Sequence, residues 1–133
     1  MIYLLDTDTI VHMLRGNRVV ADRIRTVGDD HVATTAINLA ELYFGAFHST
    51  RVDENIRTVD AFRQVTRVFG FDSRAAVIFG KIKAALKRER NLLNDSDLFI
   101  AAVALSADAV LVTNNVRHFR RIEGLALESW TQE

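Results

Sequence analysis

Short apolar segments that alternate with longer helical ones set the strongest limit on how this chain can fold. Strands that alternate with helices form parallel sheets, because each crossover returns the chain to the same edge of the sheet. The expected strands lack polar–apolar alternation, as is typical when both faces of a sheet are buried. The sequence therefore predicts an α/β fold with a short central parallel sheet covered by helices on both faces. The expected strands are residues 2–5, 31–34, 68–71, 109–113 and 125–128.

The segments between these strands have the three-to-four spacing of amphipathic helices. Good N-cap residues precede three of them, namely Thr35, Asp72 or Ser73, and Asn94 or Asp95. Proline is absent and only 6 glycines occur, so nothing in the chain reads as a linker. We therefore expect one domain over residues 1–133. The expected helices are residues 9–14, 19–27, 36–47, 55–67, 74–91 and 96–106.

Composition excludes several classes of protein. The chain has no cysteine, which rules out disulfides and thiolate metal sites. The first apolar run is interrupted at Asp6, unlike a signal peptide. No apolar run approaches the roughly 20 residues that a membrane span needs. We therefore expect a cytoplasmic protein without membrane contact.

The 17 basic and 17 acidic side chains cancel, but the basic ones are unevenly distributed. Such groups are either solvated helix faces or the borders of a groove that binds phosphates. One basic group comprises Lys81, Lys83, Lys87, Arg88 and Arg90, and the other comprises Arg117, His118, Arg120 and Arg121.

Acidic residues stand where a parallel sheet binds its ligands, beyond the carboxyl ends of the strands. Asp6 directly follows the first strand, Glu41 lies in the helix after the second, and Asp97 opens the helix before the fourth. All three are embedded in apolar sequence, where an unpaired charge is costly. No single lysine or arginine is an obvious partner for all three. A hard cation with oxygen ligands, most suitably magnesium, is therefore expected.

Each acid also has an ordinary structural interpretation. Asp6 can cap a helix, Asp97 can favour the positive end of its helix, and Glu41 can lie on the surface. Asp8 and Asp95 fit caps, or groups that support the ligands by hydrogen bonds. The metal site is thus indicated by the joint placement of the acids and not by any one of them.

Other catalytic patterns are weak or missing. The sequence contains no glycine-rich phosphate loop and no glycine-flanked nucleophilic serine. The four histidines lack the spacing of zinc ligands, so we expect structural or surface roles for His12, His31, His48 and His118.

Four segments resemble PIN-domain proteins of the VapC toxin type. They are residues 4–8 (LLDTD), 40–45 (AELYFG), 95–102 (DSDLFIAA) and the closing block 112–125, and the likeness extends from residue 2 to about 130. The resemblance implies a PIN fold and a magnesium- or manganese-dependent endoribonuclease. Such an enzyme is usually the toxin of a type II toxin–antitoxin pair.

The resemblance also implies roles for individual residues. Asp6, Glu41 and Asp97 become the catalytic and metal-binding acids, with Asp6 and Asp97 as direct ligands. Glu41 then binds a metal-bound water or a second ion, and Asn115 takes a fourth catalytic position. Many family members have aspartate where this chain has Asn115, and often asparagine where it has Asp8. The neutral Asn115 lowers the charge of the site by one, which favours a single ion at rest.

Partners follow from the same resemblance. RNA is the expected substrate, held by the two basic groups, and Thr7 and Thr113 are expected to hydrogen-bond the acids. A cognate antitoxin is expected to block the acidic groove, with its helix received by an apolar face within residues 37–44 or 56–62. A homodimer is a further implication.

Two other functions compete with this interpretation. Asp6 and Asp8 after the first strand also resemble the acids of haloacid-dehalogenase-like phosphatases, with Asp95 and Asp97 as later acids. A non-enzymatic receiver domain, which binds metal in signalling, has similar length, and Asp72 fits its phosphorylated residue. That class needs a lysine after the last strand, and this chain has none after Lys87.

Overall fold

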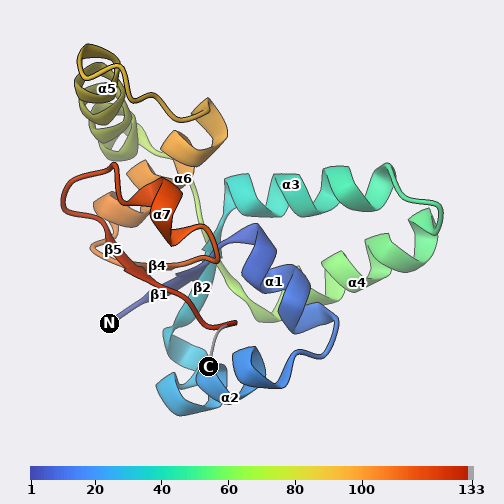
Figure 1. Ribbon diagram of the computed structural model, residues 1–133. Helices are drawn as coiled ribbons and strands as arrows, with labels where there is room; N and C mark the ends of the chain where they lie inside the picture. The colour runs from blue at the N-terminus through green and yellow to red at the C-terminus, as the bar shows by residue number, and fades with distance from the viewer. Residues whose placement is uncertain (132–133) are drawn as a thin grey trace.

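Five parallel strands form one sheet in the order β3-β2-β1-β4-β5 in the computed structural model, which describes residues 1–131 (Figure 1). Residues 132–133 of the predicted domain lie outside the described residues. At the centre of the sheet, Leu4 of β1 is level with Ala33 of β2 and Leu111 of β4. The predicted parallel α/β fold is confirmed. The strands are β1 (Tyr3–Leu5), β2 (Val32–Thr35), β3 (Arg67–Phe69), β4 (Val110–Val112) and β5 (Ala126–Glu128).

Helices connect the strands and cover both faces of the sheet (Figure 1). α5 and α6 pack on one face, and α1 and α2 lie on the other. The helices are α1 (Thr7–Leu14), α2 (Arg18–Val27), α3 (Ala36–Phe47), α4 (Val52–Val65), α5 (Ser73–Arg88), α6 (Asp95–Ser106) and α7 (Val116–Phe119), with a 3₁₀ helix at Asp29–His31.

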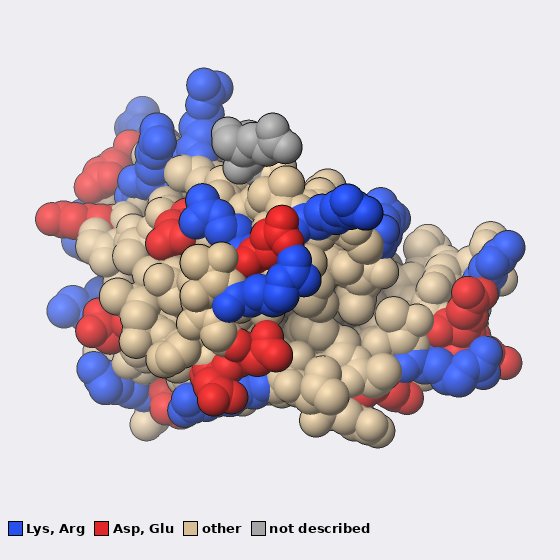
Figure 2. Space-filling view, turned by 90° about the horizontal axis from the view of Figure 1, so that it is seen from below, with Lys and Arg blue, Asp and Glu red and all other residues tan. Residues whose placement is uncertain are grey.

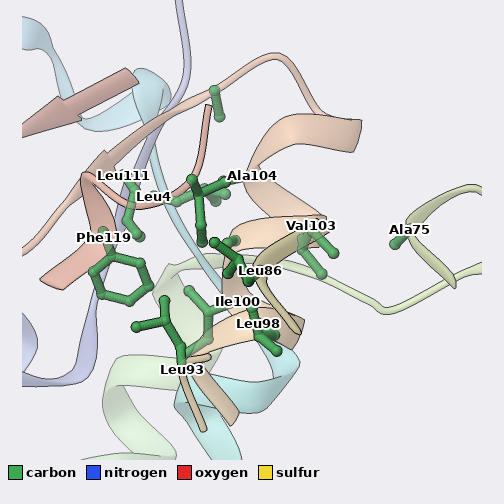
Figure 3. Packing of buried hydrophobic residues seen from close by; sticks show 14 of the residues in the cluster. Leu4, Ala75, Leu86, Leu93, Leu98, Ile100, Val103, Ala104, Leu111 and Phe119 are labelled. Atoms are coloured by element: carbon green, nitrogen blue, oxygen red, sulfur yellow. The ribbon is translucent and has the colours of Figure 1, made fainter. Parts of the chain in front are cut away.

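The sheet divides the apolar interior into two clusters because successive strand residues point to opposite faces. Leu4 and Leu111 belong to the cluster beneath α5, α6 and α7, which also contains Phe119 (Figure 3). Leu5 and Val112 belong to the cluster beneath α1, α2 and α4. Both clusters thus hold the central strands rigidly, and with them the loops at the carboxyl ends of the strands.

Helix α6 is buried on nearly every side, as its sequence predicts. Leu98 and the run Ile100–Ala104 are buried, and small residues let α5 and the sheet approach closely. The exception within residues 98–104 is Phe99, which is half-buried. A helix this tightly enclosed fixes the position of the acidic residues in its first turn.

Helices α3 and α4 pack against each other and project away from the sheet as an arm (Figure 1). Of the apolar faces proposed to receive a partner helix, Leu42, Val59 and Phe62 are buried within the arm. Phe44 is 70% exposed and Phe47 is 65% exposed. The arm thus keeps part of its apolar surface in solvent.

Element boundaries differ from the sequence prediction where tertiary pairing intervenes. The helix expected over residues 55–67 runs from Val52 to Val65, because Arg67 begins the strand that pairs with β2. The helix expected to reach residue 91 ends at Arg88, and Arg90 adopts a left-handed φ of 56°. The 3₁₀ helix and α7 were not predicted, since both are too short to show periodicity.

We expect Leu111→Ala to lower the free energy of unfolding by about 2–5 kcal/mol, because Leu111 is wholly buried between the sheet and α6. Urea denaturation followed by circular dichroism measures the change. Leu92→Ala makes the same deletion at a residue that is 43% exposed, and it should cost about 0.5 kcal/mol or less. Equal losses in the two variants would contradict this account of the core.

Candidate active site

Asp6 lies at the carboxyl end of β1, at the centre of the sheet edge where the neighbouring strands also end. Its backbone N–H donates to the Val112 carbonyl at 2.8 Å, which continues the β1–β4 pairing to this residue. Its side chain caps α1 by accepting the Thr7 backbone N–H at 3.0 Å. Asp6 therefore both caps α1 and lies at the centre of the sheet edge.

Three neutral donors hold the Asp6 carboxylate, which is only 8% exposed. Besides the Thr7 backbone, Asn38 Nδ2 donates to Oδ1 at 2.8 Å and Thr113 Oγ1 donates to Oδ2 at 2.7 Å. Asn38 comes from the first turn of α3 and Thr113 from the residue after β4. The side chain is thus fixed by three different segments of the fold.

Burial raises the pKa of Asp6 from 3.8 to about 6. Desolvation of the carboxylate is the largest cause, and the nearby charge of Asp8 raises the pKa further. The hydrogen bonds from Thr113, Thr7 and Asn38 act in the opposite direction without cancelling the effect of burial. The ionised form of Asp6 is therefore held at a free-energy cost, of the kind that a bound cation offsets.

Glu41 joins this network from the second turn of α3, where it is half-buried. Thr7 Oγ1 donates to Glu41 Oε1 at 2.5 Å, and Ser96 Oγ donates to Oε2 at 3.0 Å. Since Asn38 Nδ2 also donates to Thr7 Oγ1 at 3.0 Å, one amide supports both Asp6 and the partner of Glu41. The structure therefore brings Glu41 to the edge where Asp6 lies and to the start of α6.

Asp97 lies in the first turn of α6, next to Ser96. Asn94 caps this helix by accepting the Asp97 backbone N–H at 2.9 Å, and its amide donates to Asp97 Oδ2 at 3.1 Å. His118 Nε2 lies 2.7 Å from the same oxygen. We expected His118 to be structural or to belong to a basic rim, and the structure instead pairs it with a candidate ligand.

Thr113 links Asp6 to the loop that carries Asn115. Its hydroxyl donates to Asp6 and accepts the Asn115 backbone N–H at 3.0 Å. The Asn115 side chain is exposed and makes no capping bond to α7. The predicted fourth position therefore adjoins Asp6 through the backbone and Thr113.

The remaining acids near the site have supporting or separate positions. Asp8 accepts the Asn114 backbone N–H at 3.2 Å, which ties α1 to the loop after β4. Asp95 forms an ion pair with Lys83 at 2.9 Å and points away from the network. Asp8 thus fits its expected supporting role, whereas Asp95 neither caps α6 nor contacts Asp6, Glu41 or Asp97.

We call Asp6, Glu41 and Asp97 the acid cluster. Within residues 1–131, no lysine or arginine forms an ion pair with any of them. No three carboxylate or imidazole groups in that range converge closely enough to hold one ion in this arrangement. The side-chain oxygens instead accept hydrogen bonds from hydroxyl, amide and imidazole groups. An all-oxygen set without a lysine or arginine partner suits a hard cation, and the ligand assignment stays a prediction.

Sequence reasoning missed three residues of this network, namely Asn38, Ser96 and His118. Asn38 is wholly buried, although asparagine is usually exposed, and it also accepts from Thr35 Oγ1 at 2.6 Å. Its position three residues before Glu41, in the first turn after a strand, was the available signal. Ser96 and His118 had no comparable signal, because their partners are distant in sequence.

A groove of about 520 Å³ runs from the acid cluster along the arm. Thr7 and Glu41 line it at the site end, and Ser49, Asn55 and Thr58 line it further out. Val11, Leu42 and Val59 are among its apolar walls. The groove therefore offers an amphipathic surface that is continuous with the acids.

The surface charge is mixed where the space-filling view shows it: basic and acidic side chains are interspersed over that face (Figure 2). Lys83 of the first basic group is partly neutralised by Asp95. Across residues 1–131, none of the helices has the length and apolar character that crossing a bilayer requires.

Comparisons with known proteins agree with this geometry. Residues 3–125 match the family model for the PIN domain. The chain is 33% identical to "Ribonuclease VapC1" of Haemophilus influenzae, over 99% of this chain and 100% of that protein. It is 31% identical to "tRNA(fMet)-specific endonuclease VapC" of Salmonella typhimurium, over 96% and 97% of the two chains. It also superposes with a TM-score of 0.91 and 28% identity on a chain of VapBC2 from Rickettsia felis, solved bound to promoter DNA, covering 98% and 99% of the two chains.

We expect Asp6→Asn to stabilise the metal-free protein at pH 7.5 by up to about 3 kcal/mol, the free energy that corresponds to a pKa rise from 3.8 to about 6. Below pH 3.8 the carboxyl is protonated in both the folded and the unfolded chain, so it imposes no penalty there. The penalty grows as the pH rises and is complete above about pH 6. Urea denaturation across this pH range in EDTA measures the difference.

Asp53→Asn is the matched control, because Asp53 is exposed on α4. It should change stability by about 0.5 kcal/mol or less at every pH. An Asp6→Asn variant that is less stable than wild type at pH 7.5 would show that the hydrogen bonds of the carboxylate outweigh the cost of burying its charge.

Proposed function

The chain belongs to the PIN-domain family of VapC ribonucleases, and we propose that it cleaves RNA with a divalent cation held by Asp6 and Asp97. In this role it is the toxin of a toxin–antitoxin pair, as its relatives and structural neighbours indicate. The observation that carries the proposal is the buried Asp6 carboxylate. It is joined by hydrogen bonds to the groups that hold Glu41, yet it has no basic partner within residues 1–131.

Magnesium or manganese would suit this set of oxygen donors. When bound, such an ion lowers the pKa of water and neutralises charge on the phosphate. Asp6 is held for ligation by Asn38 and Thr113, which fix its rotamer from both sides. Asp97 is oriented by Asn94 and His118 in the same way. Preorganised ligands of this kind lose little conformational entropy when the ion binds.

Glu41 is the residue best placed to act on the attacking water. Thr7 and Ser96 each donate to a different carboxylate oxygen, so the side chain is fixed in direction. A carboxylate held in this way can orient a water molecule and accept its proton. Asn115 has no charge to contribute, and its exposed amide can donate to a phosphate oxygen. We therefore favour one resting ion over two.

Membership of the VapC family implies a cognate antitoxin as partner, and we propose that it binds in the groove beside the acid cluster. The groove is apolar at Val11 and Leu14, which keep part of their surface in solvent, and it reaches Glu41 at one end. An amphipathic helix lies in such a groove with its apolar side inward. A basic residue at the end of that segment would then neutralise the acids directly. The predicted homodimer stays a prediction.

The two alternative functions lose their supporting residues in the structure. Asp95 and Asp97 open a helix instead of following a strand, and Asp95 is paired with Lys83. This arrangement does not match a phosphatase, whose later acids follow a strand. Asp72 caps α5 by accepting the Ala75 N–H at 2.9 Å, so it is not the free aspartate that a receiver domain needs.

We expect Asp6→Ala and Asp97→Ala each to lower the rate of RNA cleavage more than about 100-fold, because removal of a ligand forfeits several kcal/mol of charge stabilisation. The assay uses total RNA and initiator tRNA, since one relative is named a tRNA(fMet)-specific endonuclease. Cleavage should need magnesium or manganese and stop in EDTA.

Asp53→Ala removes an exposed carboxylate of α4 and should cleave at the wild-type rate. Isothermal titration with manganese gives an independent readout, because both ligand variants should lose binding while keeping their folded circular dichroism. If either variant cleaves as fast as wild type, the assignment of these ligands is wrong.

We expect Thr58→Arg to weaken binding of the antitoxin more than about tenfold, because the long side chain fills the outer part of the groove. RNA cleavage should be unchanged, since Thr58 belongs to α4 and takes no part in the hydrogen bonds of the acid cluster. Thr26→Arg places the same side chain on the exposed surface of α2 and should have no effect. Co-expression with the antitoxin and surface plasmon resonance measure the difference, and equal binding by all three proteins would place the antitoxin elsewhere.

A further inference from the structure

Three aromatic rings form a cluster on the outer side of α5 and α6, and we call Phe71, Phe79 and Phe99 the aromatic cluster. The rings of Phe79 and Phe99 are stacked, with centroids 4.4 Å apart and planes 13° from parallel. Phe71 meets both of them edge to face, at 6.2 Å and 5.0 Å. Packing between the rings therefore fixes their orientation before any partner arrives.

The aromatic cluster is not sealed inside the protein. Phe71 is 38% exposed, and Phe79 and Phe99 are half-buried. Phe99 stands out because its neighbours Leu98 and Ile100 are wholly buried. A cluster that served only to attach α5 to α6 would have no need of an open side.

The aromatic cluster is continuous with the acid cluster along one face of α6. Ser96 and Phe99 are three residues apart, so their side chains share a helix face. The Ser96 hydroxyl reaches Glu41 Oε2 at 3.0 Å. Phe71 follows β3 at the same sheet edge from which Asp6 emerges. The aromatic cluster therefore begins one helical turn from the serine that contacts Glu41.

Positive charge accompanies the rings. Lys83 Nζ lies 5.6 Å from the centre of the Phe79 ring and forms an ion pair with Asp95 at 2.9 Å. Lys81, Lys87 and Arg88 are exposed on the same helix. Cations beside aromatic faces are typical of surfaces that bind single-stranded nucleic acid, where bases stack and phosphates are attracted.

We propose that the aromatic cluster is a base-binding subsite, which stacks an unpaired nucleobase of the RNA next to the cleaved bond. This inference rests on the proposed ribonuclease function and adds to it a determinant of substrate choice. The phosphate lies at the acid cluster, the adjoining base lies against the Phe71 and Phe99 side of the cluster, and Lys83 faces the following phosphate. An RNA that is paired at this position cannot present its base to the rings, so cleavage favours unpaired segments.

The test compares wild type with Phe71→Ala on RNA oligonucleotides that span the mapped cleavage site, each made abasic at one position. For wild type, one abasic position should raise KM about 5- to 100-fold with little change in kcat, as expected for loss of one stacked base. Phe71→Ala should raise KM on intact RNA by a similar factor. Its KM should then rise less than about twofold further when that base is removed, because the two changes delete the same contact.

Phe71→Leu keeps most of the apolar volume but lacks the aromatic face. It should show the rise in KM that is expected for Phe71→Ala, and it provides a folded variant if the alanine variant folds poorly. Phe47→Ala, at a phenylalanine that is 65% exposed on the arm, is the matched control and should retain the wild-type KM. Fluorescence anisotropy of the labelled RNA in EDTA repeats the comparison without cleavage. Lys83→Gln should lower the salt dependence of that binding by about one phosphate contact.

Three results would overturn the subsite. In the first, Phe71→Ala and Phe71→Leu bind and cleave every oligonucleotide like wild type. In the second, the rise in KM caused by the Phe71 substitution and the rise caused by the abasic position multiply, which means that they delete separate contacts. In the third, either variant changes the mass measured by light scattering, which assigns the rings to an interface between two copies of the chain. Failure of the proposed function is distinct from all three, because wild type itself would then leave the intact RNA uncleaved.

Discussion

A carboxylate buried without a basic partner is the feature on which the rest of this site depends. Asp6 is fixed at the carboxyl end of β1 by Asn38 and Thr113, and burial raises its pKa to about 6. Neutral donors orient this side chain but do not compensate its charge. The fold therefore keeps an uncompensated acid at the edge of the sheet, joined through Asn38 and Thr7 to the side chain of Glu41.

The rigidity of that position comes from residues that take no part in the chemistry. Helix α6 is enclosed by apolar neighbours on almost every side, so the first turn that carries Asp97 cannot drift. Asn38 connects the N-terminus of α3 to Asp6 and to Thr7, which in turn holds Glu41. Residues from three helices and two strand ends thus share one hydrogen-bonded frame. Such frames reduce the reorganisation that binding and catalysis need.

Two surfaces lie next to the acid cluster on different elements, and each suits a different partner. The groove along the arm ends at Glu41 and is amphipathic, which fits a helix of the antitoxin. The aromatic cluster on α5 and α6 begins one helical turn beyond Ser96 and carries Lys83, which fits RNA. In the proposed arrangement, an antitoxin in the groove would therefore compete for the acids without covering the aromatic cluster.

The α/β class and the parallel sheet could be predicted from the chain alone, because short apolar runs between helical segments are local signals. The same reasoning named Asp6, Glu41 and Asp97 as candidate ligands, and that assignment stays a prediction. Sequence reasoning also placed Thr7 and Thr113 beside the acids correctly. Tertiary structure alone decided that His118 pairs with Asp97, that Ser96 reaches Glu41, and that Asn38 is buried. These contacts join residues 21 to 55 positions apart or depend on the angle between helices, so no periodicity in the chain reports them. Asp95 shows the converse: it stands two residues from Asp97 in the sequence, yet the rotation of α6 directs it to Lys83 and away from the site.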